Sequence, residues 1–382
     1  MRKDGSDTES VLLVDDNPMN LQVLFQTLEN QGCKMLIAKT GEMALSIAGK
    51  AHPNLILLDI MMPGIDGFEV CRRLKTDPDT EDIPVIFLSA LGETEDKVKG
   101  LQLGAVDYIS KPFQPEEVIA RVNTHLTIHR LKQEVQTQKD QLENELQVVS
   151  EVQRSLLPKG LPEIDGLKLA VSYETSRYAG GDYYDFAKLA GNRWGLLVAD
   201  AEGHSAPAAV LMSMTCALFR AYPGTPDDPP EVLNYLNNHL LKVIEKGFIT
   251  ALYAVYDANN RTLRISRAGH PPPVIFSASN NSVMEPPCAG IFPLGITDFE
   301  NVPVSEVELH RGDRFLIYTD GLTERFNTNE EPYGLERLFD QFGKIDAHHP
   351  QDILEAILAD VENFSAGRPA DDDLALLVCT VE

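Results

Sequence analysis

The chain has 382 residues, which is enough for two or three domains that each bury a core. Its hydrophobic share of 43% and charged share of 24% are ordinary for a soluble globular protein. A formal net charge of -25 argues against nucleic acid as a partner, because phosphate backbones need clustered Lys and Arg.

The cysteines and the apolar runs give the expected compartment. The five cysteines are scattered without CxxC or metal-like spacing, which indicates reduced, packed thiols. No apolar run approaches the roughly 18 residues of a membrane helix, and the polar N-terminus does not resemble a signal peptide. We therefore expect a cytoplasmic protein without a membrane partner.

The first part of the chain alternates apolar runs with amphipathic stretches. The runs lie at 11–14, 55–58, 85–88 and around 106–109, and stretches of helical spacing such as 18–30 and 66–75 lie between them. Strands that alternate with helices predict an α/β domain with a doubly wound parallel sheet. The carboxyl ends of such strands line one crevice, where ligands bind.

Polar residues follow these strands and should converge in that crevice. Asp15, Asp16 and Asp59 are three carboxylates that repel one another unless a hard cation such as Mg²⁺ lies among them. A carboxylate can attack phosphorus to form an acyl phosphate, and Lys111 would neutralise the developing charge. Ser89 would then hydrogen-bond a phosphoryl oxygen.

The combination of these motifs resembles the receiver domain of bacterial two-component response regulators. The resemblance covers residue 10 to about 125 and implies a domain at 1–125 with a five-stranded sheet. It implies that a sensor histidine kinase is the partner, that Asp59 is the phospho-acceptor, and that Asp15, Asp16 and Asp59 bind Mg²⁺. It also implies the switch hydroxyl and the phosphate-binding lysine at Ser89 and Lys111. Tyr108 falls at the position of the switch aromatic, and a simple core tyrosine is the alternative.

A heptad pattern connects the two halves of the chain. The seam alternates in steps of three and four over about four repeats, through Leu131, Val135, Gln138, Leu142, Glu145, Val149, Val152 and Leu156. It predicts a coiled-coil linker helix over 126–158 that forms a homodimer, with packing inside the chain as the alternative. The polar seam positions Gln138 and Glu145 suit a helix whose pairing changes with phosphorylation.

Beyond Pro158 the pattern changes to mixed strands and helices. Strands are predicted at 167–173, 193–199, 250–256, 261–267, 273–277, 303–309, 314–318 and 374–380, and helices near 205–221, 230–246, 335–342 and 350–365. This pattern indicates an α+β domain over 159–382, a β-sandwich flanked by helices. Aspartates at several strand ends would make an all-oxygen site for two Mg²⁺ or Mn²⁺ ions.

The order of these acidic motifs resembles the bacterial branch of the metal-dependent PPM serine/threonine phosphatases. The group with the nearest pattern acts on anti-sigma-factor antagonists, and the resemblance covers roughly 150–382. It implies that Asp182 and Asp200 bridge two metals with the Ala201 carbonyl as a further ligand. It places Asp320 and Asp372 at the second metal. The remaining candidates are Asp373 as a competing ligand, Gly181 for close backbone approach to a metal, and His204 as a proton donor or a structural histidine.

The loop after Asp200 departs from the pattern of these relatives. It reads Ala-Glu-Gly-His-Ser where relatives commonly carry Val-Ser-Gly-His-Gly, so Glu202 and Ser205 add bulk and charge beside the metals. The leading hypothesis is a response regulator whose output is a protein phosphatase. The alternatives are a non-catalytic adaptor that binds a sigma-factor regulator and, against the acidic charge, a DNA-binding regulator.

Overall fold

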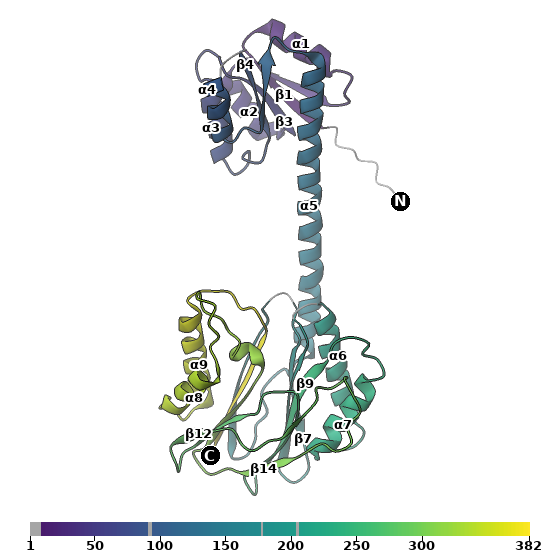
Figure 1. The fold of residues 1–382 in the computed structure, drawn as a ribbon, viewed down its shortest axis with the longest axis vertical. Coiled ribbons are helices and arrows are strands. Elements are labelled where there is room, and N and C mark those ends of the chain that lie inside the picture. Colours follow the sequence, from purple (N-terminus) through teal and green to yellow (C-terminus); the bar gives the residue numbers. More distant parts are fainter. Residues whose placement is uncertain (1–8, 91–93, 177–178, 204–205) are drawn as a thin grey trace. The chain divides into compact units, whose positions relative to one another are not determined.

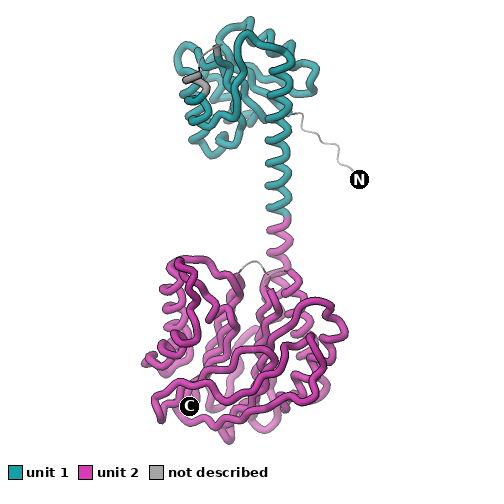
Figure 2. The backbone as a smooth tube through the Cα atoms, in the orientation of Figure 1, with its two compact units in different colours: residues 1–141 teal, residues 142–382 magenta. Residues whose placement is uncertain are grey.

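The computed structural model describes residues 9–90, 94–176, 179–203 and 206–382, without the side chains of residues 90 and 94–97. Two compact units, residues 1–141 and 142–382, divide the chain within one long helix (Figure 2). The boundaries predicted from the sequence, at 125 and 158, separate the linker helix from the domains on either side of it. These boundaries stay a prediction. In the described part of the chain, no helix has the length and hydropathy needed to cross a bilayer.

The first unit is a parallel five-stranded sheet with helices on both faces (Figure 1). The strand order is β2-β1-β3-β4-β5. The strands are β1 (Ser10–Val14), β2 (Lys34–Ala38), β3 (Leu55–Asp59), β4 (Val85–Ala90) and β5 (Asp107–Lys111). The helices are α1 (Pro18–Leu28), α2 (Gly41–Ala51), α3 (Gly67–Thr76), α4 (Thr94–Gln102) and the start of α5 (Pro115–Leu156). The predicted fold class is confirmed, although the sequence analysis did not identify β2.

Burial on both faces explains why the central strands are continuous apolar runs rather than alternating ones. Leu12 and Val14 pack with α2 and α3, whereas Val11 and Leu13 pack with α1 and α5. Successive side chains of a strand point to opposite faces, so each strand contributes to both cores. The strand ends that carry the acids are therefore held firmly from two sides.

Helix α5 begins as the last helix of the receiver and continues without interruption to Leu156. Val118, Val122 and Leu126 are buried against the sheet. Between Ile128 and Val152 the large apolar residues of the seam are more than a third exposed, namely Ile128, Leu131, Val135, Leu142, Val149 and Val152. The long linker helix is confirmed; at the end of its seam Leu156 is half-buried and packs against a core of the second unit, whereas the six residues just named stay exposed.

The second unit is a sandwich of two mainly antiparallel sheets. One sheet has the order β13-β10-β9-β8-β7, with β14 added to β10, and the other has the order β12-β11-β15-β16-β6. The strands are β6 (Leu167–Glu174), β7 (Asp182–Lys188), β8 (Arg193–Ala201), β9 (Ile249–Asp257), β10 (Thr262–Ala268), β11 (Val274–Ser277), β12 (Ser282–Met284), β13 (Gly290–Ile291), β14 (Ser305–Glu308), β15 (Arg314–Tyr318) and β16 (Leu374–Val381). The predicted α+β sandwich is confirmed.

Each sheet has one face in the central core and one face under a pair of helices. α6 (Ala206–Arg220) and α7 (Pro229–Leu240) cover the first sheet, and α8 (Leu335–Lys344) and α9 (Pro350–Ser365) cover the second (Figure 1). The core between the sheets is built from residues such as Val198, Leu252 and Ile317. α7 is shorter than predicted because the amides of Lys242 and Val243 bond three residues back, which tightens the last turn.

Candidate functional site

The receiver acids converge at the carboxyl ends of β1 and β3. Asp15, Asp16 and Asp59 each offer an oxygen, and these oxygens all lie within 4.8 Å of one another. Asp15 and Asp59 are buried and Asp16 is exposed. Such a compact all-oxygen set suits Mg²⁺, so the residues present fit the ion that the fold implies.

Lys111 at the end of β5 lies between two of these acids. Its Nζ is 2.8 Å from an oxygen of Asp15 and 2.8 Å from an oxygen of Asp59. Burial alone would lower the pKa of Lys111, but its hydrogen bonds to the two carboxylates raise that pKa. Burial raises the pKa of Asp59, and the hydrogen bond from Lys111 opposes this rise. The site therefore holds its own counter-charge.

Ser89 and Tyr108 lie on the neighbouring strands β4 and β5. Ser89 is 2% exposed, and within the described residues its hydroxyl has no hydrogen-bond partner. A buried hydroxyl without a partner is unfavourable in isolation and is suited to receive a ligand. Tyr108 is half-buried against the receiver core, with the guanidinium of Arg121 5.5 Å from its ring centroid.

In the second unit, two aspartates face each other across a strand pair. Asp182 is the first residue of β7, and its register partner on β8 is Asp200. The backbone continues this pairing, because the Ala201 amide donates to the Gly181 carbonyl at 3.2 Å. The ladder therefore fixes both carboxylates at one end of the sheet, beside the Ala201 carbonyl.

Asp320 and Asp372 come from the other sheet. Asp320 follows β15 and begins a single 3₁₀ turn (Asp320–Leu322), and Asp372 lies in the loop before β16. Both are half-buried, and β15 pairs with β16, so the two segments run side by side. Within the described residues, no three of the acids in this unit have ligand oxygens all within 4.8 Å.

Mutual repulsion among these acids is visible in their pKa values. Burial and then the charge of Asp200 raise the pKa of Asp182 well above its usual range. Burial, Asp320 and Asp372 raise the pKa of Asp200 to about 8, and burial and Asp372 raise that of Asp320 to about 6. Among the described residues, none of these acids forms an ion pair with a Lys, Arg or His. The donor set fits divalent cations that supply the missing positive charge.

Two glycines keep the backbone open beside the acids. A Cβ on Gly181 would lie 2.3 Å from the Ala201 carbonyl oxygen, and a Cβ on Gly180 would lie 2.4 Å from an oxygen of Asp373. Asp373 itself accepts hydrogen bonds from the amides of Gly181, at 2.7 Å, and Ser176, at 2.8 Å. Asp373 thus holds the glycine turn, and its own amide donates a hydrogen bond to an oxygen of Asp372 at 2.9 Å.

Two further residues contact this site, and the sequence analysis gave them no role. The Thr319 hydroxyl donates to Asp182 at 2.7 Å. Gln153, in the last turn of α5, is 3% exposed, and its side-chain amide exchanges two hydrogen bonds with the backbone of Gly180. A buried Gln directed at a glycine turn is not readable from one sequence, because its partner lies 27 residues away. His204 and Ser205 lie outside the described residues.

The comparisons with known proteins agree with this geometry. The response regulator receiver domain family matches residues 11–123. The stage II sporulation protein E (SpoIIE) family matches residues 190–382, which is half of the chain. The chain belongs to the SpoIIE family. It combines an N-terminal receiver domain with a C-terminal SpoIIE-type PP2C phosphatase domain.

Solved structures resemble the SpoIIE domain at low identity. The SiaA PP2C domain of Pseudomonas aeruginosa is 20% identical, with a TM-score of 0.54 over 64% of this chain and 98% of that one, and this likeness concerns the fold alone. The RsbU and RsbW domains of Rv1364c from Mycobacterium tuberculosis are 26% identical, with a TM-score of 0.51 over 59% of this chain and 63% of that one.

Two curated relatives each match about a third of the chain. The transcriptional regulator RpaA of Synechocystis sp. is 43% identical over 116 residues, which are 30% of this chain and 48% of that protein. PhoB of Pseudomonas aeruginosa is 43% identical over 118 residues, 31% of this chain and 52% of that protein. The chain thus spans about half the length of these relatives.

Proposed function

We propose that this protein is a two-component response regulator whose receiver controls a metal-dependent phosphoserine/phosphothreonine protein phosphatase. A sensor histidine kinase would transfer a phosphoryl group to Asp59, beside Asp15, Asp16, Lys111 and Ser89. The phosphatase would act on a phosphorylated protein, and an anti-sigma-factor antagonist is the substrate class that the family indicates. The observation that carries the proposal is the group of buried acids, with raised pKa values, in a SpoIIE-type domain.

Two Mn²⁺ or Mg²⁺ ions would be held by Asp182, Asp200, the Ala201 carbonyl, Asp320 and Asp372. Ions bound there supply Lewis-acid charge neutralisation for phosphoryl transfer to water. The protein residues prepare the site: Thr319 orients Asp182 through its hydroxyl, and Gly181 leaves the Ala201 carbonyl accessible.

The proposed control runs through α5. The exposed seam of this helix is suited to pairing with a second copy, since exposed apolar residues at heptad spacing are buried by coiled-coil formation. At the end of the same helix Gln153 bonds the glycine turn that precedes Asp182. A change in helix pairing that moves Gln153 would therefore move the backbone beside the metals. We expect phosphorylation to activate.

A phosphate-release assay on a phosphoserine protein with Mn²⁺ tests the enzyme, with the wild type compared with Asp200→Ala. We expect metal-dependent turnover that the substitution abolishes. Absence of turnover with the receiver either phosphorylated or unphosphorylated would favour the non-catalytic adaptor, in which the same domain only binds a sigma-factor regulator. Crosslinking at Val135 and Val149 with and without phosphorylation tests the change in pairing.

A further inference from the structure

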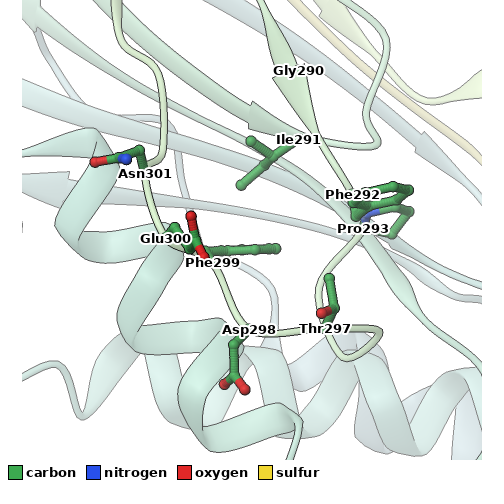
Figure 3. A pocket seen from close by; sticks show the side chains of 9 residues that line it. All are labelled: Gly290, Ile291, Phe292, Pro293, Thr297, Asp298, Phe299, Glu300 and Asn301. Carbon is green, nitrogen blue, oxygen red and sulfur yellow. The ribbon is translucent and has the colours of Figure 1, made fainter.

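The loop between β13 and β14 forms an apolar cleft at the edge of the first sheet of the phosphatase domain. The cleft has a volume of about 590 Å³. Ile291 and Phe299 project into it, and Phe292 and Pro293 lie beside each other on one wall (Figure 3). Phe292 is 68% exposed and Ile296, in the same loop, is 50% exposed. Large exposed side chains that gather beside a cleft are typical of an interaction surface.

Backbone pairing ties this loop to the metal acids. Leu294 exchanges two hydrogen bonds, of 3.0 and 2.8 Å, with Ile249 on β9. Ile249 in turn is the register partner of Ala201 on β8, next to Asp200. Neighbouring strands lie about 4.8 Å apart, so two such steps separate Leu294 from Ala201 by about 10 Å. The cleft therefore borders the same end of the sheet as the catalytic acids.

The surface between the cleft and the acids is formed by the segment around residues 243–247. A Cβ on Gly295 would lie 3.0 Å from Ile244, and a Cβ on Gly247 would lie 3.4 Å from a carboxylate oxygen of Glu202. Val243, in the same segment, is 58% exposed. A protein bound over the catalytic acids would thus meet apolar surface with an acidic residue at its inner border.

The outer border is acidic as well. Asp298 and Glu300 line the cleft and are exposed, and within the described residues neither forms an ion pair with a Lys, Arg or His. Two carboxylates beside an apolar hollow favour an occupant that combines an apolar side chain with a basic one. They disfavour a second copy of this chain, because its net charge is -25.

We propose that this cleft docks the phosphoprotein substrate, through an apolar side chain and an adjacent Lys or Arg that lie about three to five extended residues from the phosphorylated residue. The separation follows from the distance of about 10 Å between Leu294, beside the cleft, and Ala201, beside the acids. An extended chain covers about 3.3 Å per residue, so three to five residues span this distance or slightly more. The inference rests on the proposed phosphatase function and adds a specificity determinant to it.

The test compares substrates that reach the cleft with one that does not. The full chain, with Mn²⁺, is given p-nitrophenyl phosphate and paired phosphoserine peptides that carry Phe-Lys or Ser-Ser four residues from the phosphoserine, on either side. We expect the Phe-Lys peptides to have about tenfold higher kcat/KM, in line with burial of one aromatic side chain. Phe292→Ser should remove this preference by raising KM, and Asp298→Asn should weaken the part that depends on Lys.

The controls separate the possible failures. Met284→Ser changes an apolar residue of similar type, 42% exposed, on β12 of the other sheet, and should leave the peptide preference unchanged. Turnover of p-nitrophenyl phosphate should be the same in the wild type and in Phe292→Ser. Absence of that turnover in the wild type, with the receiver phosphorylated and with it unphosphorylated, would refute the phosphatase itself. The docking assignment would be overturned by an unchanged peptide preference in Phe292→Ser. It would also be overturned if sedimentation velocity showed that Phe292→Ser changes the oligomeric state, because the cleft would then be an interface between copies of this chain.

Discussion

Both acidic sites of this chain gather carboxylates that repel one another, but the two sites differ in how this negative charge is neutralised. In the receiver, Lys111 lies 2.8 Å from both Asp15 and Asp59, so part of the negative charge is neutralised by the protein itself. In the phosphatase domain, Asp182, Asp200 and Asp320 have raised pKa values, and the described residues provide them with no cationic partner.

The proposed function of each site accounts for the difference. A receiver must hold its acids together while it waits for a phosphoryl group, so a resident lysine is useful in every state. A two-metal hydrolase needs its carboxylates open to ions, and a lysine among them would compete with those ions. The receiver site should therefore be nearly complete without metal, whereas the phosphatase site should depend on it.

The largest expected effect is on catalysis. Asp200→Asn removes a charge that the proposed bridging ions require, and we expect phosphatase activity to fall by at least about a hundredfold, the scale seen when electrostatic stabilisation is lost. Asp59→Asn should leave turnover of p-nitrophenyl phosphate intact. Asp371→Asn is the matched control, since Asp371 adjoins Asp372 but pairs with Arg368. An equal loss in Asp371→Asn would contradict the assignment of the site.

Metal removal should lower the thermal stability of the phosphatase domain more than that of the receiver. At saturating Mn²⁺, about a hundredfold above its Kd, binding stabilises the native state by about 2.7 kcal/mol. We expect EDTA to lower the thermal midpoint of the phosphatase domain by several degrees and to change that of the receiver much less. Scanning calorimetry of the full chain, with the receiver transition identified from an Asp59→Asn variant, provides the measurement. Equal shifts in both transitions would remove the contrast.

Loss of the clamp, by which we mean the two hydrogen bonds between the Gln153 side chain in α5 and the Gly180 backbone, should have an intermediate effect. Gln153→Ala would leave the amide and carbonyl of Gly180 without partners, which costs about 1–3 kcal/mol for a buried group. We expect about tenfold weaker Mn²⁺ activation, with activity partly restored at high Mn²⁺. Gln147→Ala, at an exposed position of the same helix, is the control. If both variants lose activity alike, general weakening of the helix rather than the clamp is responsible.

The sequence predicted the receiver more completely than the phosphatase domain, because the functional residues of the receiver lie next to strand ends in the sequence. In the receiver most functional residues lie at or just after the end of an apolar run, as Asp59 follows 55–58, so strand ends and chemistry coincide. β2 (Lys34–Ala38) was missed because its burial is partial and its apolar run is short. A parallel sheet then brings all the strand ends together without further information.

In the phosphatase domain, the strand that carries Asp182 was missed. β7 begins at Asp182 and carries a second acid, Asp185, which is buried and paired with Arg220. Acidic residues are depleted in strands, so the sequence analysis did not predict a strand here. The roles of Gln153 and Asp373 were equally inaccessible, because both act through hydrogen bonds to the glycine turn. Such contacts depend on tertiary structure rather than on any periodicity.

The smallest expected effect is the pH dependence of the metal-free phosphatase domain. The pKa values of Asp200, about 8, and Asp320, about 6, are raised above the value of about 4 for an unfolded Asp. The folded state therefore binds these protons more tightly than the unfolded state does. Its stability contribution is full below about pH 4 and is lost as the pH rises through 6 to 8.

In EDTA, the midpoint of the phosphatase transition should therefore fall between pH 5.5 and pH 8.5, by an amount equivalent to about 1–2 kcal/mol. Asp200→Asn should flatten this slope and raise the midpoint at pH 8, because an uncharged amide removes the repulsion. Saturating Mn²⁺ should flatten the slope in the wild type for the same reason. A wild-type midpoint that is flat in EDTA would mean that the acids are already neutralised in the metal-free protein, and the contrast with the receiver would fail.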